Sequence, residues 1–417
     1  MTSAAIGTAD STPELRETNR RPKRRPFRSE HGAVLRSSNR HTIKEGNSMA
    51  TMKAARLHQV GTTFSIDEIA VPKPRPNDVL VKVKACGIIP NMKNVMAHYA
   101  EWFPFLPLPP LPAIYGLDAS GEVVEVGSQV KSIKVGDRVY VNPGTSCGSC
   151  HACRCGQPIN CDAYTFLGYF GFGPRSSQVF VDYPYAGFAE YMTAPASSLV
   201  KLPSSVSYEA AARLGYLGTA YSALRKAGAR AGTSVIVSGA TGTLGLGAVI
   251  LALGMGVTKI FGVARDKKLL ERLRTIAPSR IHVLSAGERQ VDEWVREHTD
   301  GLGADIFIDA VGPGAPSSTS LAGINALRRG GRMVDIGGMA EPLPLEMFRL
   351  MCFQISVIGS LWFDVAEGQD MVEMAAAGTL DLSVFEHERY PLRDISKALE
   401  AVDRRTGGFT NVVIVHE

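Results

Sequence analysis

The stretch VIVSGATGTLG, residues 235–245, decides the fold of the second half of this chain. Its first residues are apolar and β-branched, as in a buried strand, and glycines at 239, 242 and 245 form a turn that leads into a helical segment. Backbone N–H groups at the start of such a helix bind pyrophosphate. A second apolar segment, residues 260–264, follows at the distance expected of a strand–helix–strand unit. The stretch therefore predicts a nucleotide site at a strand-to-helix turn.

Around this turn the chain alternates between strand-like and helical segments. Strands are predicted at residues 235–238, 260–264, 306–310 and 333–336, with helical segments between several of them. This alternation is typical of the α/β class, a parallel sheet with helices on both faces.

The two ends of the chain have a different texture. Residues 53–141 contain short Val/Ile-rich runs and predict a β-rich region, interrupted by a proline-dense loop at 103–112. The last fifty residues hold an amphipathic segment at 395–402 and a strand at 412–415.

Charge and hydropathy exclude two classes of partner. Residues 1–48 carry ten Lys/Arg and five acids, which is the whole net charge of +5, so the remaining residues are neutral. We therefore expect no nucleic-acid partner. Residues 231–258 contain no charged side chain, but glycines interrupt them, and a buried strand with its covering helix is equally apolar. The protein is expected to be cytoplasmic, with no membrane segment.

The segment 1–48 is polar and Arg-rich, without helical or strand periodicity, and is expected to be a disordered basic tail. Its five acids weaken the alternative of an organelle transit peptide. Met49 and Met52 both precede a strand-like run, so a further alternative is that the tail is not translated.

Five of the seven cysteines fall within residues 147–161. The spacing Cys147-x2-Cys150-x2-Cys153-x7-Cys161 puts four thiolates on one short loop, enough for a tetrahedral zinc shell. Disulfides are the alternative, but dense cysteines in a cytosolic chain more often indicate a metal. Four thiolates leave no open coordination position, so one structural Zn²⁺ per subunit is predicted. Cys155 is the spare thiol.

The residues of the glycine turn are predicted to hold the cofactor: Gly239, Thr241, Gly242, Thr243, Leu244 and Gly245. Sites that prefer NAD(H) usually end the second strand with an acid, but Ala264 and then Arg265 stand here, with Lys268 nearby. A cation in that place favours the 2′-phosphate, hence NADP(H) over NAD(H). The alternatives are that Arg265 stacks on adenine or faces solvent, and that Asp266 partly neutralises the patch.

A strand-rich first half with a four-cysteine lobe, a nucleotide-binding second half and a return to the first half resembles the medium-chain dehydrogenase/reductase superfamily over residues 52–417. The resemblance implies a GroES-like catalytic domain at residues 49–206 and 362–417, with a zinc lobe at 142–166, and a Rossmann domain at 207–361. It implies an NAD(P)-dependent oxidoreductase with its active site between the domains, Val311 and Gly337 near the nicotinamide, and a homodimer or homotetramer.

The cysteine spacing is that of zinc-type alcohol dehydrogenases, but the positions of their catalytic zinc ligands differ here. Those positions hold Ile89, Leu117 and Gly215, none of which has a donor atom in its side chain. The patterns Gly87-x-x-Pro90 and Gly116-x-Asp118 look instead like the zinc-independent quinone and enoyl reductases. The resemblance thus implies a structural zinc without a catalytic one.

Without zinc as a Lewis acid, hydride delivery is easier to an alkene conjugated with a carbonyl or thioester, or to a quinone. Such a reaction needs a hydrogen-bond donor or general acid near the forming enolate. The candidates are Asn91, at the proton-relay position of the zinc enzymes, and Tyr99, Tyr115 and Tyr216. The alternative for each is structural, since tyrosines near a cleft often pack and an asparagine often holds a loop.

Residues 169–185 have the character of an insertion rich in aromatic residues. With Trp102, Phe103 and Phe105 they are expected either to line a pocket for an apolar or aromatic small-molecule substrate or to form a subunit contact.

The leading hypothesis is an NAD(P)H-dependent reductase of an activated C=C bond (enone, enal or enoyl) or of a quinone. The alternatives are an alcohol dehydrogenase or carbonyl reductase, and a nucleotide-binding protein without catalysis.

Overall fold

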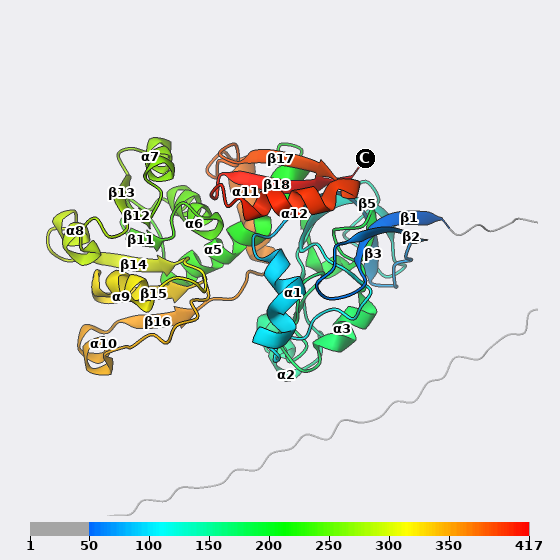
Figure 1. Cartoon of the computed structure of the whole chain (residues 1–417), viewed down its shortest axis with the longest axis horizontal. Helices are drawn as coiled ribbons and strands as arrows, with labels where there is room; N and C mark the ends of the chain where they lie inside the picture. Colours follow the sequence, from blue (N-terminus) through cyan, green and yellow to red (C-terminus); the bar gives the residue numbers. More distant parts are fainter. Residues whose placement is uncertain (1–49, 417) are drawn as a thin grey trace, which may run out of the picture. The chain divides into compact units, whose positions relative to one another are not determined.

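The structure is a computed structural model that describes residues 50–416 (Figure 1). The predicted basic tail, residues 1–48, lies outside the described residues. These described residues form one unit by their mutual contacts.

The first region of the chain is built from strands that are mainly antiparallel. A three-stranded sheet has the order β2-β1-β4, and a seven-stranded sheet has the order β10-β6-β5-β3-β18-β17, with β9 also paired to β3. The strands are β1 Thr51–Leu57, β2 Ser65–Ala70, β3 Asp78–Gly87, β4 Ala113–Ile114, β5 Asp118–Val126, β6 Arg138–Val141, β9 Tyr191–Pro195, β10 Leu199–Lys201, β17 Glu386–Pro391 and β18 Thr410–Val415. Because β18 pairs antiparallel with β3, the C-terminal segment completes a sheet that the first region begins.

A small lobe follows β6. It contains the two-stranded pair β7 Gly144–Thr145 and β8 Thr165–Phe166, the helix α2 His151–Arg154 and the 3₁₀ turn η1 Pro158–Asn160. Helix α3, Ser176–Asp182, comes next in the aromatic-rich segment. The loop from 103 to 112 contains no helix or strand, as its prolines predict.

The second half of the chain forms a parallel six-stranded sheet with the order β13-β12-β11-β14-β15-β16. Its strands lie side by side in Figure 1. They are β11 Ser234–Ser238, β12 Lys259–Ala264, β13 Ile281–Ser285, β14 Ala304–Asp309, β15 Leu327–Asp335 and β16 Ser356–Gly359. The strand order reverses at β11, and such a switch point leaves a crevice at the carboxyl ends of the strands. The predicted α/β class with a Rossmann-type sheet is confirmed.

Helices cover and connect these sheets. They are α1 Met92–Trp102, α4 Tyr208–Ala211, α5 Leu214–Ala227, α6 Thr243–Gly254, α7 Lys267–Ile276, α8 Val291–Glu297, α9 Ser317–Asn325, α10 Met347–Phe353, α11 Val365–Ala376 and α12 Ile395–Asp403, with 3₁₀ turns η2 Ala196–Ser198 and η3 Leu392–Asp394. The uncharged stretch around α6 is apolar because this helix packs on α5 and on the sheet. Within residues 50–416, no helix has the length and apolarity needed to span a bilayer.

Candidate functional site

The structure brings the four predicted zinc ligands together in the lobe. The Sγ atoms of Cys147, Cys150, Cys153 and Cys161 all lie within 4.8 Å of one another. The Sγ–Sγ distances are 3.5 Å between Cys150 and Cys153 and 3.6 Å between Cys147 and Cys161. These distances are far longer than a disulfide bond and close to the edge of about 3.8 Å in a tetrahedron with Zn–S bonds of about 2.3 Å. The cysteine set therefore fits a structural zinc ion.

Backbone amides favour the thiolate form of one cysteine of this cluster, Cys147. The amides of Ser149 and Cys150 lower the pKa of Cys147 to about 6. Cys161 is buried, which raises the pKa of its thiol to about 12, although amide donors oppose the shift. A zinc ion is the charge that favours four thiolates here, since it deprotonates coordinating thiols. Cys155 is exposed and lies beside His151, with Sγ 3.7 Å from Nε2, outside the cluster.

The glycine turn after β11 has the backbone conformation and the close backbone contacts that a nucleotide-binding turn requires. Gly239 has φ +64°, where residues with a side chain are strained. A Cβ atom on Gly245 would lie 2.1 Å from the Gly239 carbonyl oxygen. Gly242 is the N-cap of α6 and has no side chain that occupies the first-turn N–H groups. Thr243 and Leu244 form the first turn of that helix. The turn therefore presents free helix N–H groups, as a pyrophosphate site does.

The other residues predicted to hold the cofactor lie at the carboxyl ends of neighbouring strands. A Cβ atom on Gly337 would lie 2.0 Å from the Val311 carbonyl oxygen, so the backbones after β14 and β15 are in contact. Arg265 and Lys268 are exposed at the end of β12 and in the first turn of α7. The Asp266 carboxylate caps α7 by accepting from the amides of Lys268 and Leu269 at 2.9 and 3.0 Å.

One contact at the turn was missed from the sequence. The Gly408 amide donates to the Thr241 carbonyl oxygen at 2.8 Å, and a Cβ atom on Gly408 would lie 2.4 Å from the Gly242 carbonyl oxygen. The segment before β18 thus packs directly on the nucleotide turn. The signal in the sequence was the Gly407-Gly408 pair, which permits close backbone approach.

The three positions that the resemblance assigns to a catalytic zinc are apolar and tightly packed here. Ile89 and Leu117 are 4% and 5% exposed and pack in the hydrophobic core. A Cβ atom on Gly215 would lie 2.0 Å from Oδ1 of Asp118. A buried carboxylate therefore fills the space into which a side chain at position 215 would project.

Asp118 is the centre of a buried polar network that the sequence analysis did not assign. The Tyr140 hydroxyl donates to its Oδ1 at 2.7 Å. Burial raises the pKa of Asp118 to about 7, against the opposing effects of Tyr140, the Arg213 guanidinium and the Gly215 amide. Arg213 is buried as well, and its Nη2 donates to the Gly408 carbonyl oxygen at 2.8 Å. The signal was an acid at the start of the apolar strand β5, together with an arginine inside an apolar helical run.

Asn91, Tyr99 and Tyr216, three of the four candidate proton donors, interact with a further side chain that the sequence did not predict, Tyr169. Asn91 is the N-cap residue of α1, and its Nδ2 donates to the Tyr99 hydroxyl at 2.6 Å. Tyr169 is buried, and the Asn91 side chain partly opposes the rise in its pKa that burial causes. Burial raises the pKa of Tyr169, reinforced by Tyr216 and Tyr99, so these side chains are electrostatically coupled. Tyr115 is 1% exposed and packs edge-to-face on Phe64, with ring centroids 6.2 Å apart.

The aromatic-rich segment divides into two parts. Phe170 and Phe172 are in ring contact, with centroids 5.1 Å apart, and Phe170 lies 5.5 Å from Tyr99. Phe103 also contacts Tyr99, at 4.9 Å. Phe180 is buried, whereas Trp102 and Phe105 are 51% and 70% exposed. The rings near Tyr99 thus border the Asn91 group, and the exposed rings face outward.

Comparison with known proteins identifies the family of the chain. Residues 75–204 match the Alcohol dehydrogenase GroES-like domain family, and residues 243–377 match the Zinc-binding dehydrogenase family. An alcohol dehydrogenase of Geobacillus stearothermophilus is 31% identical over 368 residues, which cover 87% of this chain and 99% of that protein. A probable D-xylulose reductase A of Aspergillus clavatus is 30% identical over 330 residues, 78% of this chain and 86% of that protein.

Solved structures show the same architecture. A thermostable alcohol dehydrogenase from Pyrobaculum aerophilum superposes with a TM-score of 0.70 at 27% identity, covering 88% of this chain and 100% of that one. The fold and the two family matches define an alcohol-dehydrogenase-like oxidoreductase that uses NAD(P). The chain belongs to the medium-chain dehydrogenase/reductase superfamily, as the sequence predicted.

Proposed function

We propose that the protein reduces an activated C=C bond (enone, enal or enoyl) or a quinone with NADPH and without a catalytic zinc ion. The observation that carries the proposal is the closed set of ligand positions: Ile89 and Leu117 are packed in the core, and Asp118 fills the space next to Gly215. Zinc-type members of this family use the metal as a Lewis acid on an alcohol or carbonyl oxygen. Hydride addition to a conjugated alkene instead gives an enolate, which a hydrogen-bond donor can stabilise without a metal.

The cofactor would be held by the glycine turn and by the ends of β12, β14 and β15. The α6 N–H groups fit a pyrophosphate, and Val311 and Gly337 border the nicotinamide side. When bound, NADPH supplies the hydride. We assign the preference for NADP(H) over NAD(H) to Arg265 and Lys268, because Asp266, the acid between them in the sequence, is engaged as a helix cap.

Asn91 and Tyr99 are the groups proposed to bind the substrate oxygen and to return a proton to the reduced product. Their 2.6 Å hydrogen bond fixes both side chains at the start and on the face of α1. Burial raises the pKa of Tyr99, so the hydroxyl keeps its proton at neutral pH and acts as a donor. Tyr216 and Tyr115 complete the set of candidates, with Tyr216 coupled to the group and Tyr115 packed on Phe64.

The substrate is proposed to be apolar or aromatic, because Phe103 and Phe170 contact Tyr99. A second candidate function is alcohol dehydrogenase or carbonyl reductase activity. It is favoured by the relatives, which are named alcohol dehydrogenase and D-xylulose reductase.

Domain organisation and assembly complete the proposal. The catalytic domain is assigned to residues 49–206 and 362–417, with its zinc lobe at 142–166, and the nucleotide-binding domain to 207–361. Residues Met347, Phe348 and Met351 of α10 are 71%, 76% and 65% exposed, and the neighbouring β16 is an edge strand. We assign this face to the contact of a cytoplasmic homodimer or homotetramer, because exposed apolar patches and open edges are usually covered.

The test is a steady-state assay of NADPH oxidation with a panel of enones, enals and quinones, set beside NADP⁺ reduction with alcohols. Turnover of the first panel with none of the second is expected. Tyr99→Phe is expected to lower kcat by about tenfold or more, because a proton donor is lost. Val181→Ala, at a 70% exposed position on α3, is the matched surface control. Alcohol oxidation as the faster reaction would favour the second candidate instead.

A further inference from the structure

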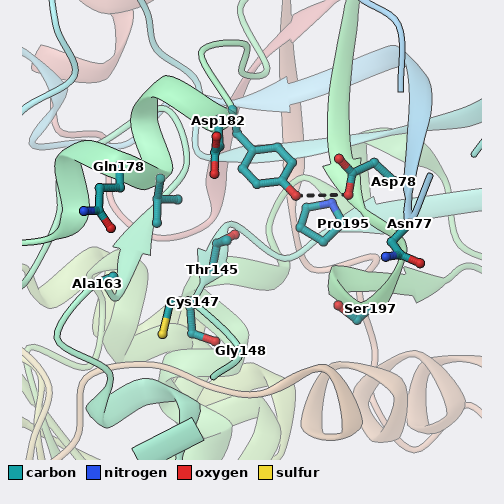
Figure 2. A pocket seen from close by; sticks show the side chains of 13 residues that line it. Asn77, Asp78, Thr145, Cys147, Gly148, Ala163, Gln178, Asp182, Pro195 and Ser197 are labelled. Atoms are coloured by element: carbon teal, nitrogen blue, oxygen red, sulfur yellow. Dashed lines mark hydrogen bonds between the residues drawn. The ribbon is translucent and has the colours of Figure 1, made fainter. Parts of the chain in front are cut away.

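A cavity of about 330 Å³ lies beside the zinc lobe (Figure 2). Four segments form its walls: the start of β3, the first cysteine loop, α3, and the end of β9 with η2. The residues of the glycine turn do not line it, and neither do Asn91 and Tyr99. Part of its wall comes from the aromatic-rich segment 169–185, through Gln178, Val179, Asp182 and Tyr183. Its volume lies at the lower end of the range of small-molecule sites, which begins at about 300 Å³.

Asp78 gives this cavity an acceptor with an unmet hydrogen-bonding requirement. The residue is 4% exposed, and the Tyr183 hydroxyl donates to its Oδ1 at 3.0 Å, the dashed contact in Figure 2. Its other oxygen, Oδ2, is buried and has no hydrogen-bond partner among the described residues. A buried carboxylate oxygen without a donor destabilises the fold, so a donor that a ligand supplies to this carboxylate would be stabilising.

The charged side chains in the cavity wall favour a ligand with a positive charge. Asp78 and Asp182 line the cavity, and no Lys, Arg or His side chain does. Asp182 pairs with Arg75 at 2.7 Å, which leaves Asp78 as the carboxylate with an open position. Four thiolates around one Zn²⁺ would give the lobe a net charge of 2−, and Cys147 forms part of the cavity wall. Both features favour a cation.

The uncharged residues of the cavity wall favour an organic cation over a metal ion. Within the described residues, the lobe cysteines are the one group of three or more His, Cys, Asp or Glu side chains close enough to hold a metal. The cavity wall instead combines amide and hydroxyl groups, Asn77, Gln178 and Ser197, with the apolar side chains of Val179 and Pro195. We propose that this cavity binds a small organic cation, a primary ammonium or guanidinium group on a short aliphatic chain, with its N–H donors toward Asp78.

The binding test is isothermal titration calorimetry on the full-length, zinc-containing protein. The probes are n-butylammonium and agmatine, and n-butanol is the neutral control of the same length. Saturable binding of at least one cation, and none of n-butanol, is expected. The same titration on Asp78→Asn, which keeps an acceptor for Tyr183 but removes the charge, is expected to show affinity lower by about tenfold or more.

Two further variants make the result decisive. Asp162→Asn removes an exposed acid that pairs with Arg175 outside the cavity, and it is expected to change the affinity by less than about twofold. Ser197→Trp fills the exposed rim with Asp78 intact and is expected to abolish binding, so it decides the case if Asp78→Asn does not fold. No saturable binding of either cation, equal binding of n-butanol, or equal affinity in wild type and Asp78→Asn would overturn the proposal.

Discussion

The zinc lobe and the surroundings of Ile89, Leu117 and Gly215, which we call the cleft, are the two places where the resemblance to zinc-type members predicts a metal. Their residues in this chain differ: the lobe has four cysteines, and the cleft has no metal-binding side chain at these three positions. In the lobe, four cysteines within residues 147–161 bring their sulfur atoms within 4.8 Å of one another. In the cleft, the three ligand positions are far apart in sequence and hold Ile89, Leu117 and Gly215. The metal ligands of the lobe all come from one short segment. A metal site in the cleft would need ligands from three segments that are distant in the sequence. Ile89 and Leu117 pack in the hydrophobic core, so these positions can support the fold without holding a metal.

The largest expected effect comes from breaking the lobe. Cys150→Ser removes one of four thiolates, and we expect the zinc content to fall from one per subunit to near zero. The free energy of unfolding is expected to fall by more than about 3 kcal/mol, because structural zinc binding is coupled to folding. Elemental analysis and denaturant unfolding measure the two effects. Cys155→Ser is the matched control, since Cys155 lies outside the cluster, and loss of zinc in that variant would contradict the assignment of ligands.

The next effect is a pH dependence that originates in the cleft. Burial raises the pKa of Asp118 from 3.8 to about 7, so between these values the native protein holds a proton that the unfolded chain has released. The free energy of unfolding therefore falls as the pH rises from about 4 to about 7, by about 4 kcal/mol at most, and stays low above that range.

Asp118→Asn is expected to remove this component, since the amide does not titrate. Wild type and variant are compared by urea unfolding at a series of pH values from 4 to 9, and the difference between their unfolding free energies is expected to change mainly below pH 7. A difference that is constant over the series is the contrary result.

A smaller effect tests whether the third ligand position is sterically closed. Gly215→Ala places a Cβ atom 2.0 Å from Asp118 Oδ1, and we expect a loss of about 1–3 kcal/mol of unfolding free energy from overpacking. Gly247→Ala is the matched helical control, because its Cβ atom would meet its nearest neighbour, Leu217 Cδ2, at 3.4 Å. Equal stability of the two variants would mean that position 215 has room for a ligand.

The smallest effect concerns the nucleotide side of the cleft. Arg265→Ala is expected to raise KM for NADPH by about tenfold, which is about 1.4 kcal/mol, and to leave KM for NADH nearly unchanged. Lys267→Ala is the control, because Lys267 pairs with Glu288 at 3.1 Å. Equal increases for the two cofactors would assign Arg265 to the adenine or to solvent.

The same contrast between local and distant residues explains what could be predicted from the sequence. The turn at 235–245, the strand at 260–264 and the cysteine spacing are local patterns, and the parallel sheet built around β11 follows from them. The strands β13 and β16 were not predicted, because β13 contains His282 and β16 is a four-residue edge strand.

The polar contacts of the cleft could not be predicted from local sequence patterns, because they join residues that are distant in the sequence. Tyr140 lies 22 positions from Asp118 in the sequence, and Gly408 lies 195 from Arg213, so neither pairing leaves a periodic signal. Asn91 was identified through the resemblance, but its electrostatic influence on Tyr169 depends on how the aromatic-rich segment folds back.

The most direct test of the contrast between lobe and cleft is the number of zinc ions per subunit, measured by elemental analysis of extensively dialysed wild-type protein. One zinc per subunit is predicted, held by Cys147, Cys150, Cys153 and Cys161. Two zinc ions per subunit would contradict the claim that the cleft holds no catalytic zinc, and would favour alcohol dehydrogenase activity instead.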